Sequence, residues 1–197
     1  MYKKLLAAAV VASLAVATGA QAKDFTGPSV GVQGGWENLD VRNPSTDLGV
    51  LPLRQKQDSA VFGGFLGYDY QIGQHVVVGA QAELNFPTGG TFGTSVASLD
   101  EKRSIDVSAR AGYLVTPKTL VYVRGGYTNA RLGTRIDNGT TSTYASEDRD
   151  GWHVGGGVER MVTDHISARL EYRYTDLSNG DGKFDRHQVL AGAAYRF

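Results

Sequence analysis

The last stretch of the sequence constrains the fold more than any other. Between residues 187 and 197 every second residue is apolar, ending with Ala193, Tyr195 and Phe197, and Gln188 and Arg196 fall between them. Alternation with a period of two predicts a β-strand, because successive strand side chains point to opposite faces. A terminal strand has a free edge unless it pairs with another strand, and pairing with the first strand would close a barrel. We therefore expect a closed β-barrel.

Residues 1–22 have the pattern of a secretory signal peptide. Lys3 and Lys4 precede an apolar run rich in Leu, Ala and Val, and Ala20-Gln21-Ala22 provides a small-residue cleavage site. The apolar run is shorter than the ~20 residues that a transmembrane helix needs. We expect cleavage after Ala22, export, and a single domain over residues 23–197.

Composition excludes several classes of function. Without Lys3 and Lys4, 18 of the 20 basic residues remain against 20 acidic ones, which gives no electrostatic basis for binding nucleic acid. The chain has no cysteine, so disulfides, thiol catalysis and cysteine-ligated metals are excluded. No long apolar run follows residue 22, which excludes a helical membrane protein but not a transmembrane β-barrel.

Eight alternating segments follow, joined in turn by short and long connections. The short connections are 72–75, 116–119 and 163–165; the long ones are 41–57, 87–103, 134–150 and 178–186. Membrane barrels have short periplasmic turns at one end and long extracellular loops at the other. The predicted strands are 28–40, 58–71, 76–86, 104–115, 120–133, 151–162, 166–177 and 187–197.

The distribution of aromatic residues decides between a soluble and a membrane sheet. Along the predicted strands, aromatic side chains on the apolar faces concentrate near both strand ends, as in the two aromatic girdles of a bilayer-spanning barrel. Arg160 also falls on this face, near the short-turn end, where it can extend towards water. The aromatic residues are Tyr68, Tyr70, Tyr113, Tyr195 and Phe197 at one end, and Trp36, Phe62, Phe86, Tyr127, Trp152, Tyr172 and Tyr174 at the other.

These features resemble the small eight-stranded outer-membrane β-barrel proteins of Gram-negative bacteria, such as the OmpA membrane domain, OmpX and the porin-like surface antigens. The resemblance covers residues 23–197 and matches the stand-alone barrels. It implies an all-β, antiparallel, up-and-down transmembrane barrel located in the outer membrane. It also implies that the terminal Tyr195 and Phe197 form a signal that the barrel-assembly machinery reads.

The opposite strand face carries full charges, which should point into the barrel. An eight-stranded barrel is only wide enough to be filled by its own side chains, and charges packed there must pair. We interpret them as an ion-paired plug, and the alternative is the wall of a narrow or gated pore. The predicted lumen charges are Glu37, Asp69, Glu83, Asp106, Glu159 and Glu171, with Arg110, Arg124, Arg169, Arg173 and Arg196.

No motif predicts a catalytic, cofactor or metal site. The four histidines, His75, His153, His165 and His187, lack metal-binding spacing, and only His153 falls clearly on the inner face. A lipid-modifying enzyme would need a serine beside a histidine, such as His187 with Ser167 or Ser178.

The function that we expect is structural: a non-enzymatic barrel that contributes to envelope integrity and exposes loops for surface interactions. Its expected partners are outer-membrane lipid, lipopolysaccharide and the barrel-assembly machinery, without a cofactor. A narrow small-solute channel is the alternative, and an outer-membrane lipid-modifying enzyme is the third reading. The sequence names no extracellular ligand.

Overall fold

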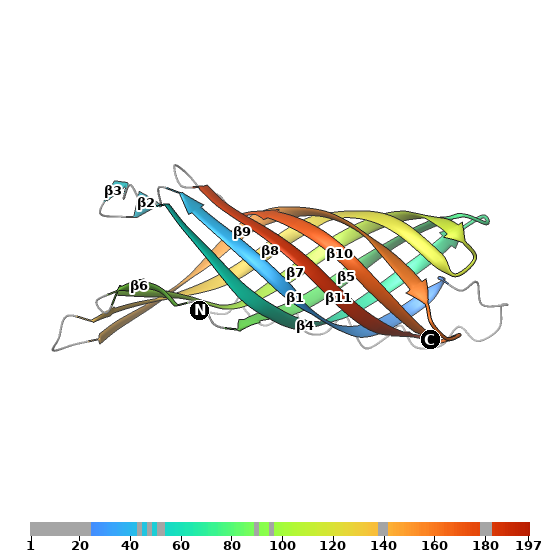
Figure 1. Ribbon diagram of the computed structural model, residues 1–197, viewed down its shortest axis with the longest axis horizontal. Helices are drawn as coiled ribbons and strands as arrows, with labels where there is room; N and C mark the ends of the chain where they lie inside the picture. The colour runs from blue at the N-terminus through green and yellow to red at the C-terminus, as the bar shows by residue number, and fades with distance from the viewer. Residues whose placement is uncertain are drawn as a thin grey trace, which may run out of the picture.

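Eight long strands form the barrel in the structure, a computed structural model that describes residues 25–42, 45–46, 49–50, 54–88, 91–94, 97–137, 142–177 and 183–197 (Figure 1). No helix long and apolar enough to cross a bilayer occurs within these ranges. The barrel strands are β1 (Gly27–Arg42), β4 (Arg54–Ile72), β5 (Val76–Thr88), β7 (Ala97–Thr116), β8 (Thr119–Asp137), β9 (Ser142–Met161), β10 (Ile166–Asp176) and β11 (Lys183–Arg196). The short strands are β2 (Ser45–Thr46), β3 (Gly49–Val50) and β6 (Thr91–Thr94).

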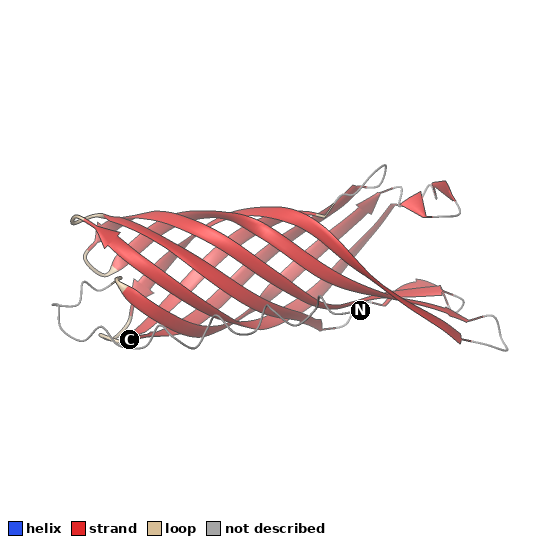
Figure 2. Cartoon of the chain, turned by 180° about the vertical axis from the view of Figure 1, so that it is seen from behind, coloured by secondary structure: helices blue, strands red, loops and turns tan. Residues whose placement is uncertain are grey.

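The barrel is closed and antiparallel throughout, with each long strand paired to its neighbours in the chain. The last strand, β11, pairs with β1 from Ser29↔Arg196 to Arg42↔Lys183, so the sheet has no free edge along this seam. Figure 2 shows the strands running obliquely around the wall. The predicted eight-stranded up-and-down barrel, with its last strand paired to its first, is confirmed.

Three tight turns join strands at the end of the barrel that holds the C-terminus (Figure 1). They connect β4 to β5, β7 to β8, and β9 to β10. In the first turn Gly73 has a φ of 65°, a left-handed conformation that side chains disfavour. In the third, the Thr163 hydroxyl accepts a hydrogen bond from the Ile166 amide at 3.0 Å. This is the short-turn end that the sequence predicted.

Strands run further into the other end than we predicted. The ranges 87–103 and 134–150 were assigned to connections, but β6, the first part of β7, the end of β8 and the start of β9 lie within them. The hairpin pairing of β8 with β9 continues to Asp137↔Ser142. Backbone pairing needs no apolar face, so a reading based on apolar alternation ends these strands too early. Parts of all four predicted long connections lie outside the described residues.

Alternate residues of each strand face opposite environments. On β10, Ile166, Ala168, Leu170 and Tyr172 are exposed on the outer wall, whereas the residues between them are buried in the lumen. The outer wall carries the predicted aromatic rings at both ends and the exposed Arg160; only Tyr174 is half-buried. The barrel is therefore apolar outside and polar inside, as the alternation predicted.

Candidate functional site

The lumen holds the buried polar and charged side chains of the barrel, so it is the candidate site. At the short-turn end it is closed by an apolar group that the sequence analysis did not identify. Residues from four strands and from the segment before β1 meet there, all at most 4% exposed. They come together because inward positions near the turns are apolar, and their contact removes area from water. The apolar group consists of Phe25, Val77, Leu114, Leu120, Tyr122 and Met161.

Next to the apolar group lies the terminal ion-pair group, formed by Asp69, Arg110, Glu159 and Arg196. Arg110 bonds Asp69 through Nε at 2.7 Å and Glu159 through Nη1 at 2.8 Å. Arg196 lies 3.0 Å from Asp69 and 2.7 Å from Glu159. Two carboxylates and two guanidiniums thus alternate in a neutral ring that joins β4, β7, β9 and β11.

Two aromatic side chains link the apolar group to the terminal ion-pair group. The Arg196 guanidinium lies 4.8 Å from the centre of the Phe25 ring, and that of Arg110 lies 5.2 Å from the centre of the Tyr122 ring. A guanidinium over an aromatic face is attracted to the ring. The Tyr122 hydroxyl then donates a hydrogen bond of 2.7 Å to Glu171, which belongs to the next group. Tyr122 therefore connects the apolar group with the charges further inside.

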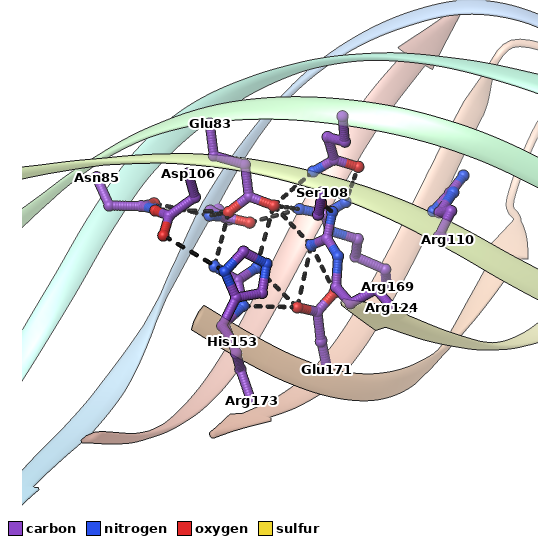
Figure 3. Close-up of polar contacts among 12 residues, drawn as sticks. Glu83, Asn85, Asp106, Ser108, Arg110, Arg124, His153, Arg169, Glu171 and Arg173 are labelled. Atoms are coloured by element: carbon purple, nitrogen blue, oxygen red, sulfur yellow. Dashed lines mark hydrogen bonds and ion pairs between the residues drawn. The ribbon is translucent and has the colours of Figure 1, made fainter. Parts of the chain in front are cut away.

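The central ion-pair group consists of Glu83, Arg124, Glu171 and Arg173 (Figure 3). Arg124 lies 2.6 Å from Glu83 and 3.0 Å from Glu171. Arg173 lies 2.9 Å from Glu83 and 2.7 Å from Glu171. All four side chains are at most 1% exposed. Buried ion pairs hold together only when their geometry and remaining hydrogen bonds are nearly complete.

Arg169 extends the central group across the barrel. Its Nη1 donates to Gln81 at 2.9 Å, and its guanidinium stacks 3.7 Å from the centre of the Phe65 ring. The Gln33 amide in turn donates to Glu83 at 2.8 Å and to Asn85 at 2.7 Å. Arg169 also donates through Nη2 to Oε1 of Gln33, so these contacts tie β10 to the neighbouring strands β1, β4 and β5, none of which pairs with β10 in the sheet.

Towards the long-connection end a second polar layer surrounds Asp106. The Asn85 amide donates to Asp106 at 2.8 Å, and the Thr128 hydroxyl also donates to it. Thr128 lies 2.8 Å from Nδ1 of His153. Since the only hydroxyl proton of Thr128 goes to Asp106, His153 Nδ1 must donate, which assigns its proton to that nitrogen. His153 thus serves as a hydrogen-bonding residue of the lumen.

The structure buries all eleven predicted lumen charges and brings nine of them into contact with an oppositely charged partner within the terminal or central groups. The other two lie nearer the long-connection end. Glu37 accepts hydrogen bonds from Ser59 at 2.7 Å and from Gln188 at 3.0 Å. Asp106 accepts hydrogen bonds from Asn85 and Thr128.

Two kinds of lumen residue were missed by the sequence analysis. Arg186, which is 2% exposed, was assigned to the connection 178–186, but it belongs to β11. Leu120 and Tyr122 alternate with the outward residues in step with Arg124, so the strand pattern also predicts that they point inward. The prediction of the lumen considered only charged residues. Parity applied to every residue type would have identified the members of the apolar group that lie on strands, but not Phe25, which precedes the first predicted strand.

The candidate enzyme pair is not assembled. Ser167 points into the lumen, where its hydroxyl donates to Glu159 at 2.6 Å. His187 belongs to the outer face, where its Nδ1 lies 2.7 Å from the hydroxyl of the exposed Tyr172. The barrel wall separates the two side chains, and Ser178 lies outside the described residues. Within the described ranges no three His, Cys, Asp or Glu residues gather as metal ligands.

Aspartates at the long-connection end are held by neutral donors across neighbouring strands. Asn129 donates to Asp150 at 2.7 Å, and Asn38 donates to Asp58 at the same distance. The hydrogen bonds from Tyr127 and Asn129 hold the pKa of the Asp150 carboxyl below its ordinary value. Asp150 therefore carries its negative charge at neutral pH.

Comparison with known proteins reveals a family. The model of the outer membrane protein β-barrel domain matches residues 6–197. A 31 kDa outer-membrane immunogenic protein of Brucella melitensis is 25% identical over 201 residues, covering 88% of this chain and 84% of the relative. A 25 kDa outer-membrane immunogenic protein of Brucella ovis is 31% identical over 144 residues, covering 72% of this chain and 66% of the relative.

Solved structures share the fold. The attachment invasion locus protein Ail of Yersinia pestis superposes with a TM-score of 0.54 at 16% identity, covering 87% of this chain and 99% of that one. The outer membrane protein AlkL, solved in lipid bilayers, gives a TM-score of 0.51 at 16% identity, covering 92% of this chain and 95% of that one.

Proposed function

The chain belongs to the outer membrane protein β-barrel domain family and is a bacterial outer-membrane protein, and from this premise we propose that it is a structural barrel of the envelope. In this role the wall is a rigid transmembrane element whose lumen is closed, and the extracellular end interacts with the surroundings. The short turns and the C-terminus then lie on the periplasmic side, and the long connections lie outside the cell.

The observation that carries this proposal is the continuous filling of the lumen. The apolar group, the terminal ion-pair group and the central ion-pair group follow one another from the periplasmic end inward, linked through Tyr122. Each layer connects strands on different sides of the barrel. A plug of this kind braces the wall and occupies the path that a solute would take.

Single-channel conductance tests the closed lumen against the small-solute channel. We expect the refolded protein to show no steady openings in planar bilayers. An Arg173→Met variant, in which the central group loses one of its cations, should show increased current noise, and Arg160→Met on the outer wall should not. Steady openings of the native chain that disappear on charge changes at Arg110 or Glu83 would instead establish a channel.

The proposal also takes the protein to be non-enzymatic. The separation of Ser167 from His187 by the barrel wall supports this, since nucleophile and base must lie within hydrogen-bonding reach. Mass spectrometry of lipid A from cells with and without the protein provides the test. A modified lipid A species that depends on the protein would refute this part of the proposal.

Surface interaction is the second part of the proposed role. The ranges 41–57, 87–103 and 134–150 are the candidate contact regions for lipopolysaccharide or extracellular surfaces. Support comes from the extended pairing of β8 with β9, up to Asp137↔Ser142, which carries the chain well beyond the aromatic ring of Trp152. The names of the Brucella relatives, outer-membrane immunogenic proteins, agree with exposure at the cell surface.

Export and assembly complete the proposal: cleavage after Ala22, and recognition of Tyr195 and Phe197 by the barrel-assembly machinery. Both rings point outward, 45% and 69% exposed, with centres 5.0 Å apart. Deleting Phe197 should reduce membrane insertion in cells far more than it lowers the stability of barrel refolded in detergent. Normal insertion of the truncated chain would argue against the signal.

A further inference from the structure

The chain enters the barrel through a short segment that turns into the periplasmic mouth. Phe25 precedes β1 and is fully buried, whereas the other members of the apolar group lie on barrel strands. Thr26 follows it and is partly buried. We call residues 25 and 26 the lid. Because the lid does not belong to the sheet, its position depends on contacts other than those that form the wall.

Gly27 is the bend between the lid and the wall. Its φ of 131° is a conformation that residues with a Cβ rarely adopt. A Cβ at this position would also lie only 3.0 Å from the carbonyl oxygen of Phe197, closer than an ordinary van der Waals contact. Glycine satisfies both conditions, so the bend that directs Phe25 into the mouth is built into the sequence.

The base of the lid is fixed to the end of the chain. The Phe197 amide donates a hydrogen bond of 3.1 Å to the carbonyl oxygen of Pro28, which also pairs with Tyr68 on β4. From Ser29 onward β1 pairs with both of its neighbours. The chain on the barrel side of Gly27 is therefore held as firmly as the wall itself.

The lid on the other side of Gly27 is held by side-chain contacts. The ladder between β1 and β4 ends at Gly27, and beyond it the Thr26 hydroxyl accepts a hydrogen bond of 3.1 Å from the Gln71 amide. The Phe25 ring packs in the apolar group, with its centre 4.8 Å from the Arg196 guanidinium. These contacts are separate from the ladders that close the barrel, so the lid can lose them while the sheet stays intact.

We propose that Phe25 and Thr26 form a periplasmic lid that opens and closes about Gly27 while the barrel remains folded. Local openings that break few contacts need much less free energy than global unfolding and therefore occur more often. When the lid lifts, the Phe25 ring leaves the apolar group, and Met161 becomes accessible from the periplasm. The inference rests on the proposed function as a barrel with a closed lumen, since both ion-pair groups still fill the interior when the lid is open.

A single thiol can report this motion, because the sequence contains no cysteine. Met161→Cys places a thiol in the apolar group, at a residue that is 3% exposed. A charged, water-soluble thiosulfonate reagent reaches this thiol only when the mouth is open. In the refolded chain of residues 23–197, we expect slow labelling that hardly depends on urea below the unfolding transition. The reason is that lifting the lid exposes little surface, whereas unfolding exposes much.

Variants of the lid should change the labelling rate of Met161→Cys. Phe25→Ala removes the ring that covers the thiol and should raise the rate about tenfold to hundredfold. Gly27→Ala should also raise it, because the added Cβ opposes the docked conformation. Gly73→Ala is the matched control: Gly73 also has a positive φ, of 65°, but the space around it is open. This variant should leave the rate unchanged.

Three results would overturn the proposal. The first is a labelling rate that rises with urea in parallel with unfolding, since the thiol would then be exposed only by global unfolding. The second is an equal rate with and without Phe25→Ala and Gly27→Ala, and the third is an equal increase in Gly73→Ala. Heat-modifiable migration on gels shows that each variant forms the barrel, and the urea dependence decides the matter if a lid variant does not fold.

Conductance separates the lid from the proposed function. Phe25→Ala should show no steady openings in planar bilayers, because the terminal and central ion-pair groups remain in place. Steady openings of the native chain would refute the closed lumen, whatever the labelling of Met161→Cys shows. Urea-independent labelling together with a silent bilayer would support both the lid and the closed barrel.

Discussion

The periplasmic and central parts of the lumen are closed by different physical means. The apolar group at the periplasmic end is stabilised by burial of area, which is non-directional and tolerates changes of shape. The central ion-pair group depends on matched charges, each of which needs partners from other strands. Burial of apolar area therefore closes the periplasmic end in a way that different apolar side chains could also achieve. The second ties particular strands together and therefore favours one register of the barrel.

The largest effect should come from breaking the central group with Arg173→Met. Both Glu83 and Glu171 would then share Arg124 as their nearest cation, with uncompensated charge in a buried setting. Removing one partner of a buried pair costs about 3–5 kcal/mol, and we expect this loss in urea-induced unfolding in lipid vesicles. Arg160→Met, at an exposed arginine of the outer wall, is the control and should change stability by less than about 0.5 kcal/mol.

The central group can also be tested by restoring its balance. Adding Glu83→Gln to Arg173→Met removes one unpaired charge and should recover part of the lost stability. If the double variant is less stable than the native chain by the sum of both single losses, the two residues do not act as a pair.

A somewhat smaller loss is expected when the apolar group is opened with Leu120→Ala. Leu120 is fully buried, and its truncation leaves a cavity beside Leu114 and Met161. Truncations of this kind cost about 2–5 kcal/mol, measurable by the same unfolding experiment. Val121→Ala, at the neighbouring outward position, is the matched control because its side chain is 44% exposed. Equal losses in the two variants would contradict an apolar plug inside the barrel.

The smallest loss of stability is expected at Tyr122, which belongs to the apolar group but donates a hydrogen bond to the central ion-pair group. Tyr122→Phe keeps the ring and its packing but removes the hydroxyl that donates to Glu171 at 2.7 Å. A hydrogen bond to a charged group is worth about 1.5–3 kcal/mol. We expect a loss near the lower end of this range, since Arg124 and Arg173 still pair with Glu171. No loss of unfolding free energy would mean that the two regions are energetically independent.

Sequence alone predicted the barrel because alternation, turn lengths and aromatic positions all pointed to one architecture. It predicted which charges lie inside, since the parity of Arg124 or Glu83 is a local property of its strand. It did not predict their partners: Arg169 and Gln81 are 88 positions apart, and only the register of the closed barrel makes them neighbours. Arg186 was missed because the strand that carries it begins in a segment with a loop-like composition.

The ring contacts among Trp152, Tyr172, Tyr174 and His187 illustrate the same limit. Each ring was assigned to the outer face or to a strand start from the sequence, but their contact requires β9, β10 and β11 to be aligned. The direction of a side chain on one strand can be predicted from the sequence. Contacts between side chains of several strands can be predicted only when the register of the sheet is known.

The seam between β1 and β11 has a consequence for how the molecule forms. Gly27 is the first residue of the barrel and Arg196 the last strand residue, so the pairing that closes the cylinder joins nearly the most distant positions available. Bringing such distant segments together has a high entropic cost, and chains dominated by long-range contacts fold slowly. Until β11 arrives, Asp69 and Glu159 lack Arg196. The pairing of the final strand with the first therefore completes the wall and the terminal ion-pair group together.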